Sequence, residues 1–324
     1  MLLAGCRDQI VYKGEGAEPS LYVYAVFDND SLNYVFVGET SFFLDKPNTQ
    51  CLDDAEVSMQ INNETAIKLT YDRDSALYAF DRHLKTGDTL RLTVSHPRLG
   101  SAEAVAIVPP EVTMTIKDVE YLTPGEMFDC YAVIEFATTN HVAVNSHYFS
   151  LDLQIELEAY TKVFDDEHWN PNTWEYEKDW TTISYWCPYF IVGQSIAAEE
   201  GAEEDVDIWN LIYGSDLRVS HFDMKENVIE CKIEFDAAQF EHFYNDSLRS
   251  ATFLSEMAIY PPEYVEFRNQ SDKARNESSN PFVEPTQVIG NVKPLEDKPV
   301  FGLFAVTRNS RASRYTSCTR TLEQ

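Results

Sequence analysis

The sequence predicts an all-β protein built from two β-sandwich domains, an N-terminal immunoglobulin-like sandwich and a larger C-terminal β-rich domain with one short helix. Many short runs alternate apolar and polar residues, which is typical of strands with one buried face. The chain has 324 residues, more than the ~250–300 at which a single hydrophobic core usually stops growing. The pair Pro109-Pro110 interrupts the strands after a stretch close to the ~100 residues of one immunoglobulin-like sandwich.

These observations predict three segments. A polar tether occupies residues 1–18, the first sandwich occupies 19–109, and the C-terminal β-rich domain occupies 111–324. Proline lacks the N–H that a central strand needs, so the boundary falls at Pro109-Pro110.

The first sandwich begins with a predicted hairpin over residues 21–39, "LYVYAVFDNDSLNYVFVGE". Two β-rich runs flank the segment Asp28–Ser31, whose side chains favour turns by bonding their own backbone. The same tetrad is the one calcium-loop lookalike, but it lacks the glycine of that motif, so a turn is favoured. Further strands are predicted where apolar residues alternate, at 57–61 and 90–94.

The C-terminal domain shows the same alternation at residues 151–157 and 229–235. A helix is predicted to begin after Pro261-Pro262, because proline suits a first helical turn. Three aromatic residues then share one face of that helix: Tyr260, Tyr264 and Phe267.

The charge balance excludes several classes of partner. The chain has 54 Asp and Glu against 25 Lys and Arg, a net charge of −29. Phosphate backbones and anionic lipid head groups would repel it, so we expect no nucleic acid partner and no electrostatic membrane binding. No run approaches the ~18 apolar residues of a membrane-spanning helix. Any membrane attachment therefore has to be a hydrophobic anchor.

The opening "MLLAGCRDQI" suggests such an anchor. Leu3–Cys6 has the form of a bacterial lipobox, and a polar stretch follows it as a tether would. Because only five residues precede Cys6, we expect the upstream part of a signal peptide to be missing. The sequence predicts lipidation of Cys6 and attachment to the outer membrane, on its periplasmic or cell-surface face. An ordinary cysteine near the terminus is the alternative.

No motif points to catalysis, a metal or a cofactor. The six cysteines include no CxxC and the seven histidines no HExxH, and any disulfide pairing is left open. Ser195 lies in a near match to a nucleophile elbow, but that motif needs a parallel α/β sheet. The acidic run 199–207 is predicted to be a solvated loop rather than a cation site. We therefore predict no catalytic residues, no metal and no cofactor.

The segment 164–190 contains four of the five tryptophans, interleaved with charges and turn-forming residues. A stretch this polar is not expected to be wholly buried, and exposed rings on loops stack against sugars, peptides or protein partners. The candidate binding residues are Trp169, Trp174, Tyr176 and Trp180. We expect at least two of the three tryptophans in this set to be exposed. The alternative is that the rings cap the open end of the second sandwich.

Several segments resemble a Bacteroidota lipoprotein family known as domain of unknown function 4249, over nearly the whole chain. Besides the lipobox cysteine, they are "LDDAEVSMQIN", "LKTGDTLRLTVSHP", "SAEAVAIVPP" and "NPFVEPTQVIGNVKPLEDKPVFGLFAV". The last is the most specific, although Glu296–Pro299 stands where many members carry a glycine pair. The resemblance implies an accessory role beside a TonB-dependent outer-membrane receptor, and it brings no catalytic residues.

Three functions follow as hypotheses. The first is a non-enzymatic, lipid-anchored binding or accessory protein in nutrient uptake, with an unknown ligand. The second is a surface hydrolase of glycans or peptides that acts through two carboxylates in a cleft. The third is an adhesin or structural subunit of the cell envelope, which would present a broad flat contact surface.

Overall fold

The computed structural model describes residues 18–29, 32–40, 50–121, 130–164, 167–186, 189–192, 196, 219–235, 248–277 and 287–317. These residues form several β-sheets, with the short helices α1 (His141–Val144) and α3 (Pro262–Glu277). The predicted all-β class is confirmed. Cys6 and all of the predicted tether except Glu18 lie outside the described residues.

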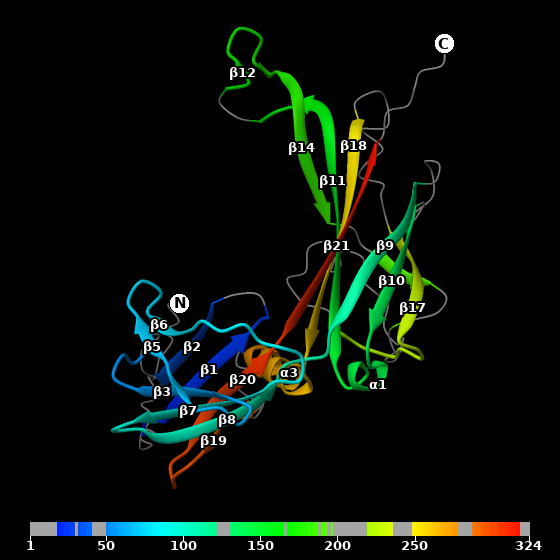
Figure 1. Ribbon diagram of the computed structural model, residues 1–324. Coiled ribbons are helices and arrows are strands. Elements are labelled where there is room, and N and C mark those ends of the chain that lie inside the picture. The colour runs from blue at the N-terminus through cyan, green and yellow to red at the C-terminus, as the bar shows by residue number, and fades with distance from the viewer. Residues whose placement is uncertain are drawn as a thin grey trace, which may run out of the picture.

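Two sheets form the first sandwich, at the lower left of Figure 1. One has the order β20-β1-β2-β6-β5: Val300–Val306, Leu21–Phe27, Asn33–Glu39, Leu77–Phe80 and Thr70–Asp72. The other has the order β19-β8-β7-β3-β4: Lys293–Pro294, Gly100–Ile107, Thr89–His96, Glu56–Ile61 and Ile67–Lys68. Their inner faces enclose one hydrophobic core, which includes Phe27, Met59, Phe80, Leu92 and Phe304.

The predicted hairpin is present, because β1 and β2 pair antiparallel from Leu21 opposite Glu39. Near its turn the Asp28 N–H donates to Asn33 Oδ1 at 2.8 Å, and Asn33 Nδ2 donates back to the Asp28 carbonyl at 3.1 Å. Asp30 and Ser31 of the predicted turn lie outside the described residues.

The first sandwich also contains strands from the far end of the chain. β20 pairs in parallel with β1, from Leu21 opposite Val300 to Phe27 opposite Val306, and β19 pairs with β8. Residues 19–109, predicted to be a complete sandwich, are thus joined by 293–306. The apolar strand β20 supplies Phe304 and Val306 to the core, and burying those side chains stabilises the long-range pairing.

The second part of the molecule has two further sheets (Figure 1). One has the order β15-β17-β10-β9: Tyr189–Val192, Val228–Phe235, Cys130–Thr138 and Val112–Tyr121. The other has the order β14-β11-β18-β21: Lys178–Trp186, Tyr148–Lys162, Leu248–Tyr260 and Arg308–Ser317, with β16 (Ser220–His221) beside β11. They share a second core, which includes Ile134, Phe136, Ile155 and Phe253.

The alternating runs form strands with the expected faces. Residues 57–61, 90–94, 151–157 and 229–235 fall in β3, β7, β11 and β17. In β11 the side chains of Leu151, Leu153, Ile155 and Leu157 are all buried. The polar residues between them point to the other face of the sheet, because successive side chains of a strand alternate.

Helix α3 begins at Pro262, as predicted. Tyr260, predicted to share an aromatic face of this helix, is instead the last residue of β18, because the prolines end the strand before the helix begins. The Tyr264 ring of the helix stacks on Tyr260 at 5.0 Å between centroids, and the Phe267 ring lies 6.2 Å from Tyr24 of β1. The four-residue α1 was not predicted. It is capped by Asn140, whose side chain accepts a hydrogen bond from the Ala143 N–H. None of the helices in the described ranges has the length and hydrophobicity to cross a membrane.

Candidate functional site

The tryptophan-rich segment lies at and near the end of a long antiparallel hairpin. β11 and β14 pair from Gln154 opposite Trp186 to Lys162 opposite Lys178. Beyond them a small ribbon, β12 (Trp169–Asn170) and β13 (Glu175–Tyr176), forms the tip. In Figure 1 this tip projects at the top of the view, far from the first sandwich.

Local hydrogen bonds set the turn at the tip. The Trp174 N–H donates to the Asn170 carbonyl at 3.0 Å, and the Asn172 N–H donates to the Asn170 side chain at 3.0 Å. Trp174 has a φ of 57°, a left-handed conformation that a bulky residue rarely adopts. The turn therefore holds this indole outward, where it is 80% exposed.

Four rings gather at this point, and we name them the tip cluster: Phe164, Trp169, Trp174 and Tyr176. The Tyr176 ring lies 4.9 Å from Trp169 and 5.0 Å from Phe164, between centroids, and Trp169 lies 6.3 Å from Trp174. These distances are typical of aromatic pairs. The rings pack on one another and not on either hydrophobic core.

The expected exposure of the tryptophans is confirmed: the exposed fractions of Trp169, Trp174 and Trp180 are 37%, 80% and 40%. The alternative, that these rings cap the second sandwich, does not fit, because all three belong to the exposed surface. Their grouping differs from the prediction. Trp180 lies outside the tip cluster, on the outer face of β14, with its ring centroid 5.7 Å from that of Tyr160.

Acidic residues outnumber basic ones in and beside the tip ribbon, with Glu167, Glu175, Glu177 and Asp179 against Lys178. Asn170 Nδ2 donates to Glu177 Oε1 at 3.0 Å, and His168 Nε2 lies 3.6 Å from Asp179 Oδ2. Asp165 and Asp166 lie outside the described residues. The tip therefore presents an apolar patch with a negative rim, which suits a neutral or cationic surface and repels an anionic one.

In the described part of the chain, three aromatic residues outside the predicted set are more than 60% exposed. Phe164 completes the tip cluster at 78% exposure, whereas Trp186 and Tyr315 are each 65% exposed on the sheet below it. Trp186 could have been found, since it lies six positions after Trp180 and an even spacing puts both on one face of a strand. Tyr315 comes from β21, whose pairing with β18 no local pattern indicates.

Chemical groups that would indicate catalysis are sparse in the described part of the chain. Its His, Cys, Asp and Glu residues form no group of three or more able to hold a metal ion. Burial raises the pKa of the Cys51 thiol, and it raises that of Cys231 to about 11, so both stay protonated at neutral pH. Ser195 and the acidic run 199–207 lie outside the described residues.

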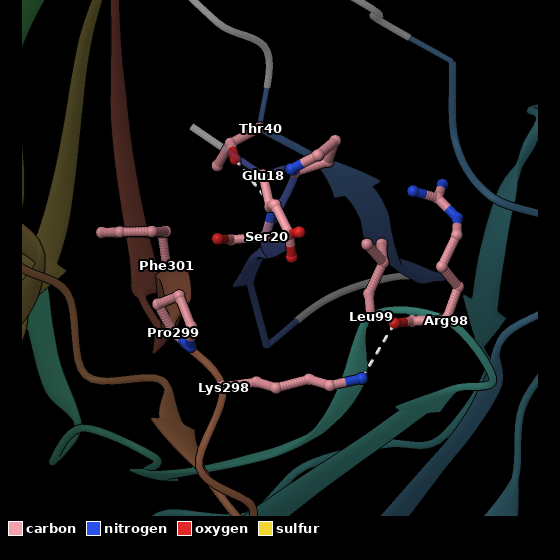
Figure 2. Close-up of a pocket in the computed structure, with 9 residues that line it drawn as sticks. Glu18, Ser20, Thr40, Arg98, Leu99, Lys298, Pro299 and Phe301 are labelled. Atoms are coloured by element: carbon pink, nitrogen blue, oxygen red, sulfur yellow. Dashed lines mark hydrogen bonds between the residues drawn. The ribbon is translucent and has the colours of Figure 1, made fainter. Parts of the chain in front are cut away.

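Figure 2 shows side chains that line a cavity of the first sandwich, among them Glu18, Arg98 and Lys298. The volume of this cavity is about 580 Å³. Two cationic side chains line it, but both are engaged. Arg98 pairs with Glu39, and Lys298 Nζ donates to the Arg98 carbonyl at 2.9 Å. Glu39 offsets the charge of Arg98 and the Glu18 carboxylate in the lining offsets that of Lys298, so the cavity has no excess of positive charge for an anionic ligand.

Comparison with known proteins identifies a family whose model matches most of the chain. The model of a family described as domain of unknown function (DUF4249) matches residues 7–313. One solved structure, "Biofilm associated protein - B domain", is 5% identical over 92% of this chain and 86% of that chain. Its TM-score of 0.17 is too low to indicate a shared fold. No curated protein matches the chain.

Proposed function

The chain belongs to the DUF4249 family, and we propose that it is a lipid-anchored lipoprotein of the Bacteroidota outer membrane. In this proposal it is a non-enzymatic binding or accessory protein that works with a TonB-dependent receptor in nutrient uptake. The observation that carries the proposal is the tip cluster, a set of exposed rings held at the end of a projecting hairpin.

The anchor is the lipid on Cys6. The lipobox form of Leu3–Cys6 supports it, as does a net charge of −29 that disfavours electrostatic binding to a membrane. Two or three acyl chains give stable attachment, at ~0.8 kcal/mol per buried CH₂. The polar residues after Cys6 then act as a tether between the membrane and the first strand, β1.

The tip cluster is the contact for the receptor. Tryptophan and tyrosine are the residue types that dominate binding energy at protein interfaces. Rings of ~150–250 Å² each are costly to leave in water, and Trp174 is 80% exposed. The acidic rim adds selectivity, because it favours a receptor surface that is neutral or basic around an apolar centre.

The anchor is tested by labelling intact cells with radioactive palmitate. We expect the wild-type chain to carry label and the Cys6→Ser variant to lose both label and membrane association. Label absent from the wild type, or a Cys6→Ser chain that remains membrane-bound, would contradict the anchor.

The receptor contact is tested by capture from solubilised native membranes with Trp174→Ala as bait. Because the ring is exposed, its loss is expected to leave the melting temperature unchanged, while capture of a barrel receptor falls at least tenfold, as for a hot-spot residue worth ~2 kcal/mol. The matched control is Val142→Ala, which removes an apolar side chain that is 70% exposed on α1 and should capture as the wild type does. Equal capture by both variants would mean that the tip cluster is not the contact.

A further inference from the structure

A second aromatic surface lies on the outer face of the sheet β14-β11-β18-β21. Side chains that are paired across these strands share a face, so the register identifies its members. The inner face carries Leu153, Ile155 and Phe253, which are buried in the second core. We define the outer face by the residues opposite to them in the alternation, from Tyr160 at one end to Asp152 at the other.

Four aromatic rings stand on this outer face: Tyr160, Trp180, Trp186 and Tyr315. Their exposed fractions are 42%, 40%, 65% and 65%. Trp180 and Trp186 lie on the same strand, so they are separated by roughly 20 Å at ~3.3 Å per residue. Two indoles that far apart along one strand cannot contact the same small molecule.

Hydrogen-bonding groups fill the space between the two tryptophans. Glu158 lies opposite Thr182 on one side and Ser250 on the other, and Glu156 lies opposite Ser184 and Thr252. The Ser250 hydroxyl donates to Glu158 Oε2 at 3.2 Å. Carboxylates and hydroxyls therefore alternate across the strands in regular rows.

The outer face is hollowed in two places. A depression of about 420 Å³ is lined by Trp180, Glu156, Glu158, Ser250 and Thr252. A second, of about 380 Å³, is lined by Trp186, Asp152, Gln154, Arg311 and Ser313. Each depression thus pairs one indole with carboxylate and hydroxyl oxygens, on consecutive stretches of the same strands.

We propose that this outer face binds a neutral, linear oligosaccharide whose chain runs along β14 from Trp180 to Trp186. The apolar face of one sugar ring stacks on each indole. The sugar hydroxyls between them donate to the carboxylates of Glu156 and Glu158, as charge-assisted hydrogen bonds, and exchange hydrogen bonds with the threonine and serine hydroxyls.

The charge of the surface selects a neutral glycan over an acidic one. The outer face carries the carboxylates of Asp152, Glu156, Glu158 and Glu256, and its guanidinium, Arg311, lies 2.9 Å from Glu256. An acidic glycan or a nucleic acid would be repelled. A basic peptide would be attracted by charge, but a peptide strand adds to a sheet through its edge, here β14, and leaves rows of side-chain hydroxyls unused.

The test uses the full-length chain with Cys6→Ser, so that it needs neither membrane nor receptor and does not depend on the proposed function. The probes are an array of neutral linear hexasaccharides (β-1,4-glucan, α-1,4-glucan, β-1,4-xylan, β-1,4-mannan) and a hexalysine peptide. Binding is measured by titration calorimetry and by tryptophan fluorescence.

We expect at least one hexasaccharide to bind, and Trp186→Ala and Trp180→Ala each to weaken it at least tenfold. Trp186→Tyr, which keeps a ring, should retain most of the affinity, and Glu158→Gln should weaken it without changing the melting temperature. The matched control is Val142→Ala, which removes an exposed apolar side chain on α1, away from both aromatic surfaces, and should bind as the wild type does.

Three results would overturn the proposal: no hexasaccharide binds, binding survives both alanine variants, or hexalysine binds and the sugars do not. The last result would assign the outer face to basic peptides.

Discussion

At the scale of single residues, Tyr78 shows how a polar group is accommodated inside the first sandwich. Its hydroxyl lies 2.8 Å from the Leu52 carbonyl and 2.9 Å from the Ala55 carbonyl, and it accepts the Ala55 N–H at 3.0 Å. The side chain is 2% exposed. Burial raises the pKa of Tyr78 to about 12, so the hydroxyl keeps its proton well above neutral pH.

Tyr78→Phe should destabilise the fold by about 1–3 kcal/mol at pH 8, because it removes the partner of buried backbone groups. The difference between the pKa of Tyr78 in the folded and in the unfolded chain predicts that the stability depends on pH. An unfolded tyrosine ionises near pH 10, whereas the folded one holds its proton to about 12, so the wild type loses stability as the pH rises between these values. The difference between variant and wild type in urea denaturation should therefore shrink from pH 8 to pH 11. An undiminished difference at pH 11 would contradict the raised pKa.

At the scale of elements, the parallel pairing of β20 with β1 depends on a glycine. Gly302 has a φ of +127°, and a Cβ there would lie 1.7 Å from the Val23 carbonyl oxygen. That oxygen belongs to the residue opposite Gly302 in the register. The contact leaves no room for a side chain, so β20 can approach β1 only with glycine at this place.

Gly302→Ala should displace β20 and destabilise the chain by at least about 1–3 kcal/mol, the cost of overpacking. Gly87→Ala is the matched control, because Gly87 also has a left-handed φ, +80°, but nothing lies within 4 Å of its Cβ position. The control carries the backbone strain alone, roughly 1–2 kcal/mol. Thermal melting should show the larger loss for Gly302→Ala. If both variants lost the same stability, β1 and β20 would have room for a side chain at position 302, which would contradict this prediction.

At the scale of the whole molecule, a segment near the C-terminal end of the chain returns to complete the first sandwich. It leaves the first sandwich at Pro109-Pro110, builds the second part, and returns through β19 and β20 to pair with β8 and β1. The first core consequently includes Val292, Phe304 and Val306 from the returning segment.

A fragment of residues 19–109 alone should not unfold cooperatively, because it lacks those core side chains and leaves one edge of β1 unpaired. The same fragment joined through a glycine–serine linker to residues 287–307 should recover a cooperative transition, measured by circular dichroism on heating. Cooperative melting of the bare fragment at the same temperature would show that the returning strands are dispensable.

The sequence alone was sufficient to predict features that neighbouring residues determine, such as the buried face of a strand or the start of a helix. Alternation in 151–157 determined which β11 side chains are buried, because a strand turns successive side chains to opposite faces. Pro262 determined where α3 begins, and the polar spacing of 164–190 indicated that Trp169 and Trp174 would be exposed.

Only the tertiary structure determined the features that depend on residues far apart in the chain, namely the pairing of distant strands and the placement of the aromatic residues. Pairing of Leu21 with Val300 follows from core packing across the whole molecule, and no local propensity encodes it. The same is true of the aromatic residues. Hairpin register placed Trp180 beside Tyr160 on the sheet and left Trp174 at the tip, and β21 brought Tyr315 to the outer face from the other end of the chain. The sequence determines which rings are exposed. Long-range strand pairing places those rings on two separate surfaces. Strand pairing is long-range because the strands that become neighbours are those that bury the side chains of both cores together.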